Sequence, residues 1–189
     1  MAARGNSERP IMRRHLLNAT MVFLLIGTPA AAERLSIYSD AALTQYTIDD
    51  SAPQVVTLYV AGFMFGSTGV RFSVRPRPGF TGVWLSDSSS FVTVGSSPTD
   101  VAVGFGTCID GSVTILTMSY QLFGTSSACS ELHPAPANGF SNAVSTTQCG
   151  GYESAIGQLD KLYANCSNPP PPVATEPTTC GRVKALYRD

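Results

Sequence analysis

Apolar and polar residues alternate along most of this chain. In residues 69–75 (GVRFSVR), apolar side chains recur at every second position, and charged or polar side chains lie between them. A period of two predicts a β-strand with one buried and one solvated face. Because no long amphipathic helical segment precedes the C-terminus, the pattern predicts an all-β fold, an antiparallel β-sandwich. Similar runs occupy residues 35–38, 54–61, 82–85, 91–94, 100–105 and 112–123, and residues 140–149 and 157–166 are further candidate strands.

Local sequence also predicts how the longest strands are joined. Asp110-Gly111 tolerates the positive φ angles of a two-residue turn, so it predicts a hairpin between residues 100–108 and 112–123. Within the second of these strands, the apolar positions change face near Ile115. This change predicts a bulge, or a crossing between sheets, at that residue.

The N-terminal segment has the pattern of an export signal. Met12-Arg13-Arg14 is followed by a short apolar run and then by Thr-Pro-Ala-Ala-Ala at residues 28–32. A basic start, a short apolar centre and a small-residue exit are typical of a signal peptide, so cleavage is expected after Ala32. The mature chain then begins at Glu33 and is exported to the periplasm, the cell surface or the extracellular space.

Two further features of this segment refine the prediction. Residues 1–11 are polar and precede Met12, which predicts that translation starts at Met12. The two arginines also resemble a twin-arginine signal, although such pairs are common in ordinary secretory signals. Asn18 and Pro29 interrupt the apolar run, which is shorter than the roughly 20 residues that span a bilayer. No transmembrane segment is therefore expected in the mature chain.

Length and charge indicate one acidic domain with a short extension. Residues 33–189 contain eight lysine and arginine residues and twelve aspartate and glutamate residues, a formal charge of −4. Nucleic-acid binding requires clustered positive charge, so no nucleic-acid partner is expected. The sandwich is assigned to residues 33–168. Residues 169–172 are four prolines that predict a stiff spacer, and a basic tail follows them to Asp189.

The five cysteines predict disulfide bonds. They all lie at or beyond residue 108, at Cys108, Cys129, Cys149, Cys166 and Cys180. Cysteines of exported proteins usually pair. The simplest pairing is sequential, Cys108 with Cys129 and Cys149 with Cys166, which leaves Cys180 over, although spacing alone keeps other pairings open. A zinc site is disfavoured because no Cys-x-x-Cys motif occurs.

Few residues indicate catalysis. His133 is the only histidine after residue 32, and it lies in a Pro- and Gly-containing stretch, residues 126–139, that predicts an exposed loop. No Gly-x-Ser-x-Gly, His-Glu-x-x-His or Gly-Lys-Ser/Thr motif is present. Gly104 and Gly106 lie within a strand pattern, where glycine allows close backbone packing or a bulge. The sequence therefore predicts no catalytic residue and no cofactor.

Three carboxylates near the first strands are candidate calcium ligands. Asp40, Asp49 and Asp50 lie close together in the sequence, and calcium prefers oxygen ligands of this kind. Their spacing matches no ligand template, and the alternative is that they are solvated turn residues. No metal ligand is assigned on this pattern.

An apolar segment at a predicted turn is the candidate contact surface. Gly62-Phe63-Met64-Phe65-Gly66 places three large apolar residues between glycines, where a turn between two strands is expected. Turn tips are normally polar, so an exposed apolar tip would indicate a binding surface. The alternative is that the segment folds back over the end of the sandwich. The candidate contact residues are Phe63, Met64, Phe65, Trp84, Phe80 and Tyr59.

Two parts of the chain resemble known exported proteins. The strands Val55–Val60, Thr68–Val74 and Val113–Leu116 resemble those of cohesin-like and other immunoglobulin-like modules of exported bacterial proteins. This resemblance covers about Gln54 to Phe123 and implies a β-sandwich. The tail from Thr178 to Arg188 resembles a C-terminal peptide of exported bacterial proteins that has tryptophan at the position of Cys180, which implies a sorting or attachment tag. A solvated charged terminus is the alternative.

These features together predict an exported, non-catalytic β-sandwich that acts as a structural or protein-interaction module. A carbohydrate-binding module that uses exposed aromatic side chains is one alternative, and a small secreted hydrolase is another. A flat exposed row of Trp84, Phe80 and Tyr59 would favour a glycan. A single apolar tip at residues 63–65 would favour a protein partner.

Overall fold

A computed structural model of the chain describes residues 32–139 and 142–170. The predicted signal peptide up to residue 31, the basic tail and Cys180 lie outside these residues. Every regular element of the described residues is a β-strand, as the alternating pattern predicts. The described residues contain no helix of the length and hydropathy that crossing a membrane requires.

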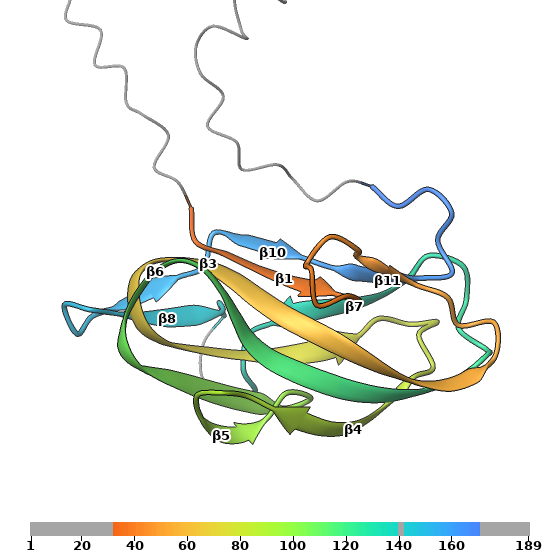
Figure 1. Cartoon of the computed structure of the whole chain (residues 1–189), viewed down its shortest axis with the longest axis horizontal. Helices are drawn as coiled ribbons and strands as arrows, with labels where there is room; N and C mark the ends of the chain where they lie inside the picture. Colours follow the sequence, from red (N-terminus) through yellow and green to blue (C-terminus); the bar gives the residue numbers. More distant parts are fainter. Residues whose placement is uncertain (1–31, 140–141, 171–189) are drawn as a thin grey trace, which may run out of the picture. The chain divides into compact units, whose positions relative to one another are not determined.

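Eleven strands follow one another along the described chain (Figure 1). They are β1 (Arg34–Tyr38), β2 (Thr47–Ile48), β3 (Pro53–Pro76), β4 (Val83–Ser88), β5 (Val92–Ser96), β6 (Asp100–Phe123), β7 (Ser130–Ala135), β8 (Ser145–Gln148), β9 (Glu153–Ala155), β10 (Gln158–Asp160) and β11 (Leu162–Ala164).

Two long strands organise the sandwich. β3 and β6 each have 24 residues and pair antiparallel from Pro53 opposite Phe123 to Phe72 opposite Val101. Both strands bend on the left side of Figure 1, so that the two halves of each strand run in different layers. A typical strand has about 5 or 6 residues, so each long strand is equivalent to two consecutive strands joined by a bend.

The shorter strands extend the two layers. In the first layer, β1 pairs with the first half of β3 and, in parallel, with β10, while β4 pairs with the second half of β6. In the second layer, β5 pairs with the first half of β6, and β8 and β9 continue outward from the second half of β3. The end of β3 pairs with β7, which continues through β11 to β2.

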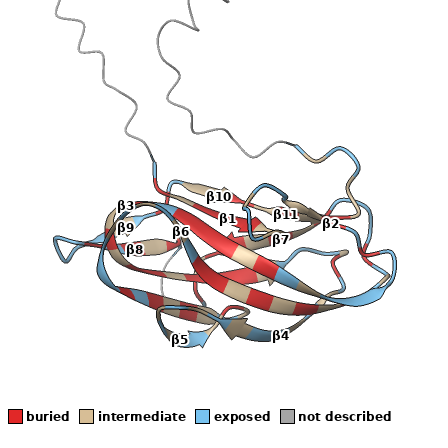
Figure 2. Cartoon of the chain, in the orientation of Figure 1, coloured by how far each residue is buried: buried red, intermediate tan, exposed pale blue. Residues whose placement is uncertain are grey.

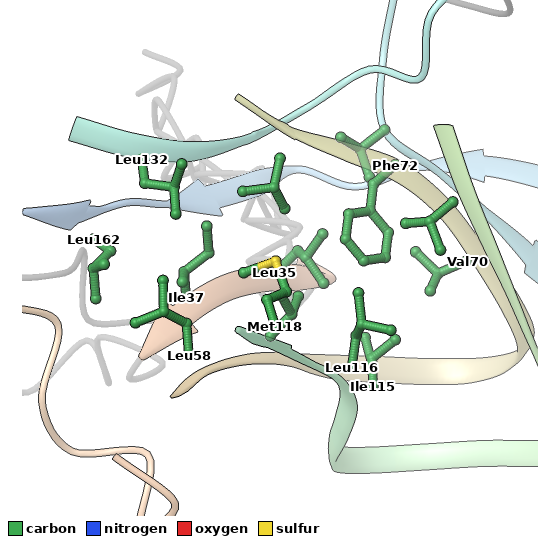
Figure 3. Close-up of a cluster of buried hydrophobic side chains, with 14 of the residues drawn as sticks. Leu35, Ile37, Leu58, Val70, Phe72, Ile115, Leu116, Met118, Leu132 and Leu162 are labelled. Atoms are coloured by element: carbon green, nitrogen blue, oxygen red, sulfur yellow. The ribbon is translucent and has the colours of Figure 1, made fainter. Parts of the chain in front are cut away.

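The core lies between the layers, where the inward positions of both long strands meet (Figures 2 and 3). Leu35, Leu58 and Met118 from the first layer and Phe72 from the second are completely buried. Each such side chain contributes about 1.5–3 kcal/mol through removal of apolar surface from water. The two-residue period of the sequence therefore corresponds to the alternation of inward and outward side chains along the strands.

The structure contradicts both predicted turns. Residues 62–66 lie within β3, and residues 110 and 111 lie within β6, so neither segment ends a strand. Phe65 pairs with Asp110 and Met64 pairs with Gly111. The hairpin predicted between residues 100–108 and 112–123 is therefore wrong: these segments are the two halves of one bent strand.

The bulge predicted near Ile115 is confirmed. Val60 pairs with Leu116 while the next residue, Ala61, pairs with Thr114, so Ile115 is an extra residue in the ladder. A bulge changes which face the following side chains occupy. Both Ile115 and Leu116 are consequently buried.

The stretch predicted as a loop around His133 contains a strand. β7 pairs with the end of β3, with His133 opposite Arg75. The prediction is wrong because Pro134 and Pro136 dominate the local pattern, whereas proline is compatible with a strand where its missing N–H is not needed.

Two disulfide bonds connect the four cysteines of the described residues. Cys108 bonds to Cys149, with Cα atoms 5.6 Å apart, and Cys129 bonds to Cys166, with Cα atoms 4.3 Å apart. The sequential pairing is therefore wrong. Cys149, directly after β8, donates its N–H to the carbonyl of Gly66 in the bend of β3, and its disulfide bond joins this point to Cys108 on β6.

Candidate functional site

The solvent side of the second layer is the most extensive candidate surface. Facing residues of four strands form two rows, Val92–Gly104–Gly69–Thr147 and Val94–Ala102–Arg71–Ser145. Glu153 on β9 extends the first row beyond Thr147. We call this surface the groove face and define it by these nine residues.

Two glycines form the floor of the groove. Gly69 and Gly104 face each other across β3 and β6, where other cross-strand pairs carry side chains. Their missing side chains leave a shallow groove of about 440 Å³. A Cβ on Gly69 would lie 2.9 Å from the carbonyl oxygen of Val103, whereas a Cβ on Gly104 would meet nothing nearer than 4.0 Å. The backbone of β6 therefore lies open to an approaching molecule.

One rim of the groove is apolar. Val92 and Val94 have 74% and 69% of their surface exposed, the two largest values among the large hydrophobic residues of the described chain. They lie on β5, which pairs with β6 and with no other strand of the described residues, so it ends the layer. Exposed valines on an edge strand with no lysine or proline lack the usual protection against association with another chain.

The opposite part of the groove face is polar and charged. Arg71 Nε donates to Asp100 Oδ1 at 2.8 Å, and the second guanidinium nitrogen bonds to Oδ2. The hydrogen bonds from Arg71 lower the pKa of Asp100, and Asp100 in turn raises the pKa of Arg71. Glu153 is exposed and adds a negative charge beside this pair.

The predicted contact residues do not form one surface. Phe63 and Phe65 point outward at the bend, with ring centroids 5.0 Å apart, and Phe63 is 36% exposed. Met64 between them is completely buried, so it is a core residue. The prediction of an apolar turn tip is therefore wrong, since the alternating positions of a strand divide these residues between its two faces.

The aromatic row that would favour a glycan is also not formed. Phe80 is only 8% exposed and contacts Tyr120 edge to face. Trp84 packs partly against the core, and its Nε1 donates to Asp87 at 2.8 Å. Tyr59 is half-buried on β3, opposite Tyr38 of β1.

His133 is not the exposed loop histidine that the sequence predicts. It is half-buried in β7, and its Nδ1 is buried without a hydrogen-bond partner among the described residues. Burial lowers the pKa of His133, and the positive charge of Arg77 lowers it further. A catalytic triad needs an acidic group on Nδ1 of its histidine to orient the ring, and no such group contacts Nδ1 of His133 among the described residues.

Two of the three candidate calcium ligands, Asp40 and Asp50, serve separate purposes, and the third, Asp49, is exposed. Asp40 accepts hydrogen bonds from Thr44 and the backbone N–H of Gln45. Asp50 is buried and accepts from backbone N–H groups at residues 124 and 126. Burial alone would raise the pKa of Asp50, but hydrogen bonds from the Ser126 side chain and from backbone N–H groups of residues 124–126 outweigh it and lower the pKa. No group of three acidic, histidine or cysteine side chains suited to a metal ion occurs in the described ranges.

Comparison with known proteins identifies the fold but not a sequence family. No family model and no curated protein sequence matches the chain. A type II cohesin domain from the cellulosome of Acetivibrio cellulolyticus superposes with a TM-score of 0.51 and 9% identity, over 71% of this chain and 95% of that one. The chain has a cohesin-like fold. The cohesin module of a Clostridium perfringens family 33 glycoside hydrolase gives a TM-score of 0.50 and 7% identity, over 72% of this chain and 98% of that one.

A two-module structure agrees with this result. The type II cohesin dyad of the Acetivibrio cellulolyticus adaptor scaffoldin matches with a TM-score of 0.51 and 10% identity, over 70% of this chain and 48% of the dyad. The cohesin-like sandwich is thus common to proteins of very different sequence. At such low identity the likeness establishes the fold, and function has to be argued from the surface.

Sequence reasoning missed the groove face. The alternation in residues 91–94 predicts a strand, but the pattern alone does not say that Val92 and Val94 face water. That follows from the pairing of β5 with β6, which directs Phe91 toward Phe105 at a centroid distance of 5.1 Å. Gly104, a glycine within a strand pattern, is the one signal in the sequence that points to the groove.

Proposed function

We propose that this cohesin-like sandwich is an exported, non-catalytic protein-interaction module and that the groove face is its docking surface. The observation that carries the proposal is the combination of a glycine floor with the exposed valine rim of β5. Large exposed apolar side chains on a soluble protein commonly mark an interaction site when polar residues surround them.

The dimensions of the groove favour a macromolecule. Small-molecule sites are usually enclosed and bury most of the ligand. This groove is open to solvent and extends across residues of β5, β6, β3, β8 and β9. A protein segment can instead cover the valine rim and contact the bared backbone at Gly104, with polar contacts at Arg71 and Glu153 around that centre.

Export supports the same function. Two disulfide bonds are compatible with an oxidising compartment, where they persist. The signal peptide predicted at residues 12–32 is consistent with this location. We therefore place the partner at the cell surface, in the periplasm or outside the cell.

Gly104 allows a specific test. Arginine at this position would fill the groove, while the open space around its Cβ leaves the fold intact. Gly104→Arg is compared with Thr57→Arg, an exposed strand position on β3 outside the groove face. The protein used is the mature chain, Glu33–Asp189, with a photo-crosslinking residue in place of Val94. Illumination in the exported fraction of the producing cells then joins this residue covalently to a bound partner.

We expect a discrete protein adduct from position 94 that Gly104→Arg abolishes and Thr57→Arg preserves. Thermal unfolding of both variants should match that of the parent, which excludes misfolding as the cause. An adduct that survives Gly104→Arg, or one that forms equally from position 57, would refute docking at the groove face.

A further inference from the structure

A buried carboxylate lies at the first residue of the predicted mature chain. Glu33 is 7% exposed. Its Oε1 accepts hydrogen bonds from Ser67 Oγ at 2.5 Å and Gln148 Nε2 at 3.0 Å, and its Oε2 accepts from Thr146 Oγ1 at 2.6 Å. The backbone N–H of Phe65 donates to Oε1 at 3.3 Å. All four donors are neutral.

This arrangement keeps Glu33 ionised without a partner of opposite charge. Burial would raise the pKa of Glu33, but the hydrogen bonds outweigh it and lower the pKa. No lysine, arginine or histidine of the described residues forms an ion pair with it: its neighbour Arg34 lies 3.6 Å from Asp160 instead. An ionised carboxylate that is removed from water is costly unless a positive charge compensates it.

Glu33 lies beside a second groove, and the residue before it, Ala32, lines part of this groove. Ala32, Phe65, Tyr152 and Gly157 line this groove, with a volume of about 360 Å³. The Cβ of Ala32 lies 3.0 Å from the position that a Cβ on Gly157 would occupy. The N–H of Gln158 donates to the carbonyl of Glu33 at 3.2 Å, so residue 33 is held in place at the edge of β10.

We propose that the α-ammonium group created at Glu33 by cleavage after Ala32 is the counter-cation of the buried Glu33 carboxylate, so that processing completes this polar cluster. Covalent geometry keeps the α-nitrogen of a glutamate within about 6 Å of its own carboxylate. Opposite charges at about 4–6 Å stabilise each other's ionised forms. Removal of Ala32 also uncovers the groove above Gly157 and gives the new ammonium access to water.

The other ionisable groups around this cluster are few. Tyr152 lines the groove, and Glu153 follows it on β9. Arg34 and Asp160 form their ion pair beside it, between β1 and β10. The packed elements β3 and β8 present only the neutral side chains of Ser67, Thr146 and Gln148.

The test compares three forms of the chain that end at Asp189: one with a free Glu33, one with N-acetylated Glu33, and one that retains Ala32. The α-amine pKa is measured by NMR titration. In the free form we expect it about one unit above the usual 7.7–8.0. In the Ala32 form, and in a free-terminus Glu33→Gln variant, we expect the usual value.

Urea unfolding gives an independent readout. The α-amine pKa is raised on folding, so its contribution is complete below about pH 7.7 and disappears as the pH rises through the folded value. At pH 6.5 the free form should have an unfolding equilibrium constant about tenfold smaller than the acetylated form, and at pH 10 the two should agree. With Glu33→Gln they should agree at both values.

Three results would overturn the proposal. They are an α-amine pKa at or below its usual value in the free form, acetylation without effect at pH 6.5, and an exported protein whose measured mass shows a different first residue.

Discussion

The two floor glycines differ in the space around them, and this difference predicts opposite effects of the same substitution. A Cβ on Gly69 would lie 2.9 Å from the carbonyl oxygen of Val103, closer than van der Waals contact allows, and that oxygen belongs to the rigid backbone of β6. Gly69→Ala should therefore destabilise the fold by about 1–3 kcal/mol, the range for overpacked sites. Gly104→Ala meets open space and should stabilise it by about 0.4–1 kcal/mol, because alanine restricts the unfolded chain.

Urea unfolding measures this difference directly. Trp84 is the only tryptophan of the chain and packs against the core, so its fluorescence reports on the folded state. The free energies of unfolding of the two variants should differ by about 1.4–4 kcal/mol, with unchanged m-values. Equal stabilities, or a Gly104→Ala variant that is the less stable of the two, would refute the assigned geometry of the groove floor.

The same geometry explains why Gly104, and not Gly69, is the position for a blocking side chain. A variant at Gly69 would lose stability together with any loss of binding, so the two effects could not be separated. At Gly104 the side chain projects into the groove itself. The stability measurement therefore tests, before a partner is known, whether a side chain at Gly104 leaves the fold intact, as the docking experiment requires.

Other predictions follow from the core, the disulfides and the buried carboxylate. Met64→Ala should lower the free energy of unfolding by about 2–5 kcal/mol in urea titrations, whereas Phe63→Ala, at a partly exposed position, should cost clearly less. Replacing both Cys129 and Cys166 with serine removes a disulfide bond between residues 37 positions apart, and the free energy of unfolding should fall by about 4 kcal/mol in the same measurement. The lowered pKa of Glu33 gives stability that is complete above pH 4.5 and is lost as the pH falls through the folded pKa, and Glu33→Gln should flatten this acid dependence of the urea midpoint.

The fold class was predictable because burial on a sandwich strand depends on alternate residues. Residues 69–75 show this in the structure, where Val70, Phe72 and Val74 are buried while Arg71 and Arg75 are only half-buried. Ser73, on the side of the two arginines, is an exception: it is buried, and its hydroxyl donates to the carbonyl of Pro136 at 2.8 Å. Such a pattern needs no knowledge of the neighbouring strands. Pairing partners, by contrast, depend on long-range topology, which is why the disulfide bonds join Cys108 to Cys149 rather than to Cys129.

The candidate site was not predictable for a related reason. In residues 91–94 both faces carry apolar or β-branched side chains, so the sequence does not distinguish the core side from the solvent side. The register of β5 on β6 determines which side chains face solvent, and a shift of one residue would bury Val92 and Val94 instead. The groove face thus depends on the tertiary structure, because the local sequence of this strand does not determine which of its faces is exposed.

The two wrong turn predictions have a common physical cause. The GFMFG segment in β3 and Asp110-Gly111 in β6 lie opposite each other, with Met64 facing Gly111 and Phe65 facing Asp110. Gly66 and Gly111 have φ angles of +66° and +102°, which a reversing turn requires but which a bulge uses equally well. The ladder register shifts beside this point, between Phe65 and Ser67 and again before Gly69. Glycines in neighbouring parts of the two strands therefore let both strands bend together from one layer into the other. Only the knowledge that the two segments pair with each other would have distinguished this bend from two separate hairpins.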